Sequence, residues 1–235
     1  MSIDINRVYQ KVLVLSNKEQ RGYISPQEFN LLADKAQLDI LDSYFHDVKT
    51  SYHKIKNETK FADEMEMLSE KLQPFKALTT INNDGTTANL SLPTDLYRIE
   101  TISRAEGEVI ELSAKEILLT ESNPLTKATI NRTVYVRDAA STVRLYPTPA
   151  PSQGQTIAFE IRYFKRPVVP IWAFVVTSGK ALHNSTDSVD FTLHKSEEEN
   201  LVIRILELAG LTINRPDIQQ AALVDKQATK QEQNN

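Results

Sequence analysis

The stretch that governs the fold runs from Ser25 to Val48 and reads SPQEFNLLADKAQLDILDSYFHDV. Ser25 followed three residues later by Glu28 is a capping-box pattern, and Pro26 suits the first position of a helix. Apolar residues then recur every three or four positions, the spacing of one helical face. They are Phe29, Ala33, Ala36, Ile40, Tyr44 and Val48, with Leu32 and Leu41 widening the stripe. The pattern predicts a helix to about Lys56 that needs a packing partner.

Other helical patterns flank this one at both ends of the chain. Residues 1–20 carry apolar residues at helical spacing, and Phe61–Leu72 predicts a shorter helix that ends before Pro74. Near the other end, the run Ser196-Glu197-Glu198-Glu199 resembles a further capping box and predicts a helix to Ala209, stopped by Gly210. We expect these helices to pack with the long one as a bundle.

The middle of the chain changes to short segments of alternating polarity, which predict strands. Turn clusters at residues 82–85 and 138–141 predict two hairpins. Between them, Ser113 and Glu116 form another capping box, which predicts a short helix through Thr120. The clearest predicted strands are Leu96–Ile102, Val109–Leu112, Thr133–Arg137, Thr142–Tyr146, Ile157–Tyr163 and Ile171–Thr177.

This order of helices, then strands, then helix predicts an α+β protein rather than repeated βαβ units. We expect a helical bundle formed by the N-terminal and C-terminal helices, with an antiparallel β-region inserted between them. The expected divisions are 1–76 (first part of the bundle), 77–177 (β-rich domain), 178–213 (loop and last bundle helix) and 214–235 (C-terminal arm).

The composition removes several classes of chemistry. The 235 residues include no cysteine and four histidines, so disulfides, thiol nucleophiles and Cys-ligated metals are excluded. The chain has no G-x-S-x-G, no P-loop and no G-x-G-x-x-G pattern. We therefore expect no enzyme, no catalytic residue, no cofactor and no metal. A net charge of −4 weighs against a surface built to clamp nucleic acid. No apolar run is long enough to predict a membrane span.

One alternative is a hydrolase with a metal held by Asp42 and His46. These residues stand four apart on the long predicted helix, a spacing that can place both side chains on one ion. The competing interpretation is a solvated helix surface, because charged pairs at this spacing are common.

The segment from Arg166 to Phe174 is the main candidate for contact with another protein. It contains Trp172, the only tryptophan, together with Val168 and two prolines. An exposed Trp with a neighbouring Arg is typical of interface cores. The same pattern also fits a bend that leads into a buried strand, and the sequence leaves both interpretations open.

Basic residues next to this segment suggest a second alternative. Arg162, Lys165 and Arg166 lie beside Tyr163 and Phe164, a mixture that can bind nucleic acid. A small nucleic-acid-binding or regulatory module is therefore the alternative function.

The C-terminal arm is polar apart from a few residues. Ile218, Leu223 and Val224 are its candidate contacts with a partner, and Asp225–Asn235 is almost wholly polar. Such an arm either folds onto a partner surface or frays in solution.

Several motifs resemble the head-to-tail adaptor or ring proteins of tailed bacteriophages, nearest to the ring proteins of crAss-like short-tailed phages. The motifs are Asn6-Arg7-Val8-Tyr9, Arg21–Asn30, Leu92–Ile99 with its Leu-Pro-x-Asp entry to the β-region, and Phe191–Glu199 with Leu201–Gly210. None of them is a catalytic signature.

The resemblance implies a structural virion protein made in the host cytoplasm. It implies a head-to-tail connector ring, with twelve expected copies, that sits below the portal protein and contacts other neck or tail ring proteins. DNA would pass through the ring as cargo, and no membrane would be involved. By the same resemblance, residues 216–235 are the expected portal contact.

Overall fold

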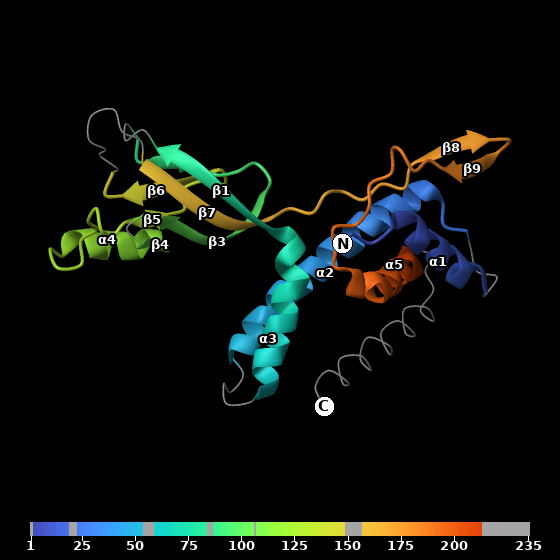
Figure 1. The fold of residues 1–235 in the computed structure, drawn as a ribbon, viewed down its shortest axis with the longest axis horizontal. Helices are drawn as coiled ribbons and strands as arrows, with labels where there is room; N and C mark the ends of the chain where they lie inside the picture. Colours follow the sequence, from blue (N-terminus) through green and yellow to red (C-terminus); the bar gives the residue numbers. More distant parts are fainter. Residues whose placement is uncertain are drawn as a thin grey trace. The chain divides into compact units, whose positions relative to one another are not determined.

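The computed structural model describes residues 2–18, 23–53, 59–83, 87–105, 107–148 and 157–212. They fall into two compact units (Figure 1). The helical unit combines residues 1–74 with residues 167–235, and the sheet unit comprises Phe75–Arg166. The helices are α1 (Ile5–Lys18), α2 (Pro26–His53), α3 (Thr59–Leu72), α4 (Ala114–Ser122) and α5 (Glu198–Thr212). The strands are β1 (Lys76–Asn83), β2 (Asn89–Ser91), β3 (Leu96–Arg104), β4 (Gly107–Glu111), β5 (Val134–Val136), β6 (Thr142–Tyr146), β7 (Ile157–Lys165), β8 (Phe174–Thr177) and β9 (Lys180–His183).

Helix α2 is the longest described helix of the helical unit, and its predicted start is confirmed. The Glu28 carboxylate accepts a hydrogen bond from the Ser25 backbone N–H at 2.9 Å, and the Glu28 N–H donates to Ser25 Oγ at 3.3 Å. These bonds lower the pKa of Glu28. The predicted stripe is buried from Phe29 to Tyr44 and packs against α5, while α1 packs against α5 as well.

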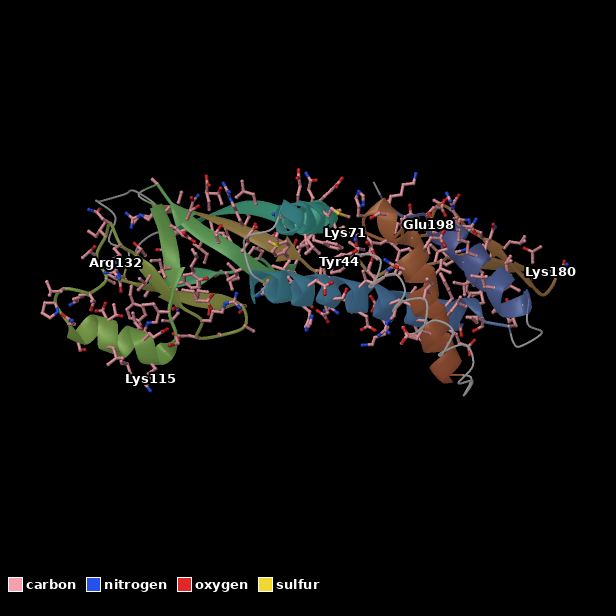
Figure 2. The ribbon with its side chains drawn as sticks, turned by 90° about the horizontal axis from the view of Figure 1, so that it is seen from below. Tyr44, Lys71, Lys115, Arg132, Lys180 and Glu198 are labelled. Atoms are coloured by element: carbon pink, nitrogen blue, oxygen red, sulfur yellow. The ribbon has the colours of Figure 1, made fainter. Side chains whose placement is uncertain are left out.

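Ion pairs also link the helices of this unit. On α1, Arg7 Nε and Lys11 Nζ lie 2.9 Å and 2.7 Å from a carboxylate oxygen of Glu198. On α3, Lys71 Nζ lies 2.8 Å from Glu197, whose side chain is almost fully buried, and 5.9 Å from the centre of the Tyr44 ring (Figure 2). Burial, followed by the nearby Glu197 charge, raises the pKa of Tyr44 far above its usual value.

Another ion pair connects α2 and α5 through Asp39 and Arg204. Arg204 Nε donates to Asp39 Oδ2 at 3.1 Å, and Lys35 Nζ lies 2.9 Å from the other carboxylate oxygen. Burial alone would raise the pKa of Asp39, but the hydrogen bonds from Lys35 and Arg204 outweigh it, so the pKa is lowered.

We predict that Asp39→Asn destabilises the helical unit by about 1–2 kcal/mol at pH 7, the range for hydrogen bonds to charged groups at a partly exposed site. Because folding lowers this pKa, the stabilisation is complete above the unfolded-state value of about 3.9 and is lost as the pH falls through the folded-state pKa. Urea unfolding followed by circular dichroism at pH 7, 5 and 3 measures the difference between the two proteins. A difference that stays constant down to pH 3 would contradict the assignment.

The entry to α5 differs from the predicted capping box. A 3₁₀ turn at Lys195–Glu197 precedes the helix, and its N-cap is His194, whose Nδ1 accepts from the Ser196 N–H at 3.3 Å. Ser196 is not the N-cap, and Glu199, the acid of the predicted box, pairs with Lys11 of α1. The capping-box prediction is therefore wrong here, because His194 provides the cap and the Glu199 carboxylate is bound to Lys11.

The sheet unit is built on a seven-stranded sheet of described residues with the order β1-β7-β3-β4-β5-β6-β2. The sheet curls until it is nearly closed, and its two edge strands β1 and β2 approach each other. Asn83 at the end of β1 is buried and its amide donates to the carbonyl oxygens of Thr87 and Asn89, both at 3.2 Å. Inside the curl, side chains from six of the strands form one core with Phe159 and Ile161 of β7 fully buried.

The predicted fold class, a helical bundle with an inserted antiparallel β-region, is wrong. The sheet is a large body with its own core, and it is mixed: β4 and β5 run parallel, with Ile110 opposite Val134. Helix α4 connects these two strands, so this part of the chain is a βαβ unit, which the sequence interpretation excluded. The helix starts with the predicted capping box at Ser113, which is confirmed.

The two predicted hairpins have different outcomes. Strands β5 and β6 pair antiparallel around residues 138–141, which confirms the second hairpin. The first is wrong, because β1 pairs with β7, and β2 pairs with β6. The strand predicted at Ile171–Thr177 begins at Phe174, since Ile171 makes only an isolated bridge to Val189.

Candidate interaction surface

Trp172 fastens the segment that begins at Pro167 to the helices of its own unit. Its side chain is 4% exposed, and its indole N–H donates to Asn6 Oδ1 at 3.1 Å. The indole packs on the Tyr9 ring at 4.4 Å between centroids. Its backbone N–H donates to Asn30 Oδ1 at 2.8 Å, and the Asn30 amide donates back to the Trp172 carbonyl at 3.3 Å. Trp172 is thus an internal anchor that points away from the molecular surface.

Gln37 holds the same segment two helical turns further along α2. The Gln37 side chain is fully buried, and its Nε2 donates to the Val168 carbonyl at 2.9 Å. Its Oε1 accepts from the Thr192 N–H at 3.0 Å and from the Thr192 hydroxyl at 3.2 Å. One amide therefore satisfies polar groups from two chain segments that lie beside α2.

We predict that Gln37→Leu destabilises the helical unit by about 2–4 kcal/mol, because it leaves the Val168 carbonyl and the Thr192 donors without their partner. Chemical denaturation followed by far-UV circular dichroism measures the loss. Gln10→Leu is the matched control, since Gln10 lies on α1 of the same unit with an exposed side chain, and it should change stability by less than about 0.5 kcal/mol. Equal effects of the two substitutions would contradict the prediction.

With its backbone fixed in this way, the segment presents aliphatic side chains to solvent. We call this surface the apolar strip; it comprises Val168, Val169, Ile171, Val175, Val176 and Leu182. Each of the six is between 42% and 64% exposed. Isolated exposed aliphatic residues are ordinary, but six on one short, fixed stretch of the fold make it a candidate interaction surface.

Half of the strip lies on the β8–β9 hairpin. Its turn has Ser178 at φ 52° and Gly179 at φ 77°, the left-handed pair that two-residue hairpins favour. Val175 is opposite Leu182, so these two share one face of the hairpin. On the other face, Phe174 and His183 stack on Trp172 at 5.8 Å and 5.5 Å between ring centroids. The base of the hairpin is therefore held by Trp172 while its outer part stays exposed.

A second group of exposed apolar residues lies in the sheet unit, on α4 and the loop that follows. Ile117 and Ala128 are buried against β5, but the remaining apolar residues of this region face solvent. They are Leu118, Leu119, Leu125 and Ile130, each at least 59% exposed. This group also fits contact with another protein.

The predicted contact residues differ in how far the structure exposes them to solvent. Val168 is exposed and Phe174 is half-buried, whereas Trp172 is buried. Arg166 is exposed at the end of the sheet unit. Ile218, Leu223 and Val224 lie outside the described residues.

The structure also shows the surroundings of the residues that suggested nucleic-acid binding or a metal site. Tyr163 and Phe164 are buried, so their rings are not available to stack on bases, although Arg162 and Arg166 are exposed. His46 lies 3.8 Å from Asp47, and among the described residues no group of three or more His, Asp or Glu side chains is placed to bind a metal. Within that part of the chain, no helix has the length and apolarity to cross a membrane.

The sequence interpretation missed Asn30 and Gln37. The signal was present for Gln37, because a polar residue at that position interrupts the buried side of α2. Asn30 carries no comparable signal, since Asn is common on helix surfaces. The exposed Leu118 and Leu119 were also missed, because a short capped helix gives no indication of which side is covered.

These observations describe a protein that works through contacts with other proteins. The chain belongs to the SU10 adaptor protein family, whose model matches residues 55–194, more than half of the chain. It is therefore a bacteriophage adaptor, a structural component of the virion, and this family is not a known family of enzymes. A search of curated proteins found no match.

Proposed function

We propose that this chain is a subunit of a head-to-tail connector ring of twelve copies. The ring joins the portal protein to the tail, contacts other neck or tail ring proteins, and surrounds the path of the DNA. Family membership supports a virion adaptor. The ring, its copy number and its partners are what we propose beyond that. The chain is made in the host cytoplasm and acts in the neck of the particle.

The apolar strip is the observation that carries the proposal. Six exposed aliphatic side chains stand on a segment whose backbone is fixed by Asn30 and Gln37. A rigid surface loses little conformational entropy on binding, so such a strip is suited to a permanent contact. Val168, at the start of the strip, is the predicted contact residue that best fits this role, and Arg166 precedes it in sequence.

The C-terminal arm is the proposed contact with the portal. Its apolar residues Ile218, Leu223 and Val224 are spaced along an otherwise polar segment, which suits an arm that docks on a partner. A passing DNA duplex needs no specific site, and the net charge of −4 suits a channel wall that does not retain DNA. The prediction that this chain is most similar to the ring proteins of crAss-like short-tailed phages remains a prediction.

Peptide mass spectrometry of purified virus particles tests the proposal. We expect peptides of this chain at twelve copies per portal ring, and electron microscopy of the protein mixed with portal should show a ring bound to the portal. Absence from the particles, or a protein that never associates with portal, would contradict the proposal.

Truncation after Thr212 tests the role of the arm. The shortened chain should keep the circular dichroism spectrum of the two folded units but lose portal binding. Ile218→Asp combined with Leu223→Asp should give the same loss in the full-length chain, with Gln219→Asp as the control that retains binding. Portal binding by the truncated chain would show that the arm is not the contact.

A further inference from the structure

The apolar strip has a charge character that limits what can cover it. Between Pro167 and Thr186 the chain contains no Asp or Glu, and its one charged residue is Lys180 next to the hairpin turn. Lys180 is exposed and lies at the outer end of the hairpin (Figure 2). A complementary surface therefore combines apolar side chains with acidic ones.

The solvent side of α2 has this complementary character. Gln27, Leu31, Asp34, Leu38 and Asp42 recur at helical spacing on the side opposite the buried stripe, and each is exposed or half-buried. Two leucines thus alternate with two aspartates, and Leu31 is 75% exposed. From Pro26 to Val48 the helix carries five acidic residues and one lysine. We call this side, defined by those five spaced residues, the outer face of α2.

The strip leaves Leu31, on the outer face of its own helix, exposed. Its backbone is bound to Asn30 and Gln37 on a flank of α2. Successive helical residues are turned by about 100°, so Leu31 points well away from Asn30. Each copy thus carries two separate and complementary surfaces on the same helical unit.

We propose that the apolar strip of one copy packs on the outer face of α2 in the next copy of this chain. A contact between two different surfaces is heterologous, and repeating it around a closing rotation generates a ring. Val176 covers Leu31 of the neighbour, while Lys180 approaches the acids of that helix. The inference rests on the proposed ring and names the interface that builds it.

Engineered cysteines test the contact, because the natural chain has no cysteine to interfere. Val176→Cys combined with Leu31→Cys should produce a ladder of disulfide-linked oligomers when assembled protein is oxidised and run on a non-reducing gel. Val176→Cys combined with Leu78→Cys is the matched control, since Leu78 is 60% exposed but lies on β1 of the sheet unit, outside both exposed apolar groups. The control pair should give no ladder.

Charge placed in the strip gives a second test on full-length protein. Val176→Asp should weaken self-association roughly tenfold or more, because it puts a carboxylate against an acidic helix in a water-excluded contact. Leu78→Asp should leave self-association unchanged, and circular dichroism should show both variants folded. Analytical ultracentrifugation with and without portal measures the assembly.

The outcomes separate the interface from the ring itself. Wild-type protein that forms no ring, alone or on portal, would overturn the proposed function and this interface with it. Rings that form normally with Val176→Asp, or equal cross-linking by both cysteine pairs, would overturn only the interface. A ladder confined to the Val176–Leu31 pair, together with weakened assembly of Val176→Asp, is the expected result.

Discussion

Trp172→Ala is expected to destabilise the helical unit by about 3–5 kcal/mol, the usual cost of truncating a buried Trp. The change removes the indole from its contact with Tyr9 and leaves Asn6 without the hydrogen bond from the indole N–H. It also takes away the ring on which Phe174 and His183 stack, so the base of the hairpin loosens. Chemical denaturation followed by far-UV circular dichroism measures the effect without relying on tryptophan fluorescence.

Val176→Ala is the matched control for this substitution. Val176 lies on the same segment but is mostly exposed, so its truncation should change stability by less than about 0.5 kcal/mol. A Trp172→Ala protein as stable as the control would show that the indole is not the anchor of the strip.

Phe159→Ala is expected to lower the free energy of unfolding of the sheet unit by a similar amount, about 3–5 kcal/mol. Phe159 is fully buried near the start of β7, which pairs with β1 on one side and with β3 on the other. A cavity here is lined by residues from both neighbours, so it cannot collapse without moving the sheet. Thermal unfolding followed in the β-sheet region of the circular dichroism spectrum measures the loss.

Glu160→Ala provides the comparison, because Glu160 is adjacent in β7 but faces solvent. It should remain within about 0.5 kcal/mol of the natural protein. If the two neighbouring substitutions had equal effects, the core assigned to the curled sheet would be wrong.

The sequence predicts those features that depend on neighbours along the chain. The apolar stripe of α2 and the capping boxes at Ser25 and Ser113 are local patterns, and the structure contains all three. The β5–β6 hairpin is local as well, since a short turn brings its strands together.

Pairing between distant segments does not leave such a local pattern. Strand β1 pairs with β7, which follows more than seventy residues later, so the turn after β1 misleads. The parallel β4–β5 pair also escaped prediction, because β5 has only three residues and the connecting helix is short.

The candidate site shows the same limit. The sequence selects the segment around Trp172 but cannot decide whether the indole faces a partner or the core. That choice depends on Asn6, Tyr9 and Asn30, which lie more than 140 residues away and converge on Trp172 only in the folded chain. The exposed residues of the apolar strip can be identified only once the structure shows that Trp172 is buried.

The pairing of β1 with β7 also has a genetic consequence. Lys76, near the start of the sheet unit, is opposite Phe164, near its end, so the chain enters and leaves this unit at neighbouring points. A body whose two ends lie side by side can be gained, lost or exchanged in one recombination event, because the rest of the chain need not be rerouted. Related phages can thus diversify what the sheet unit touches while inheriting the helical unit unchanged.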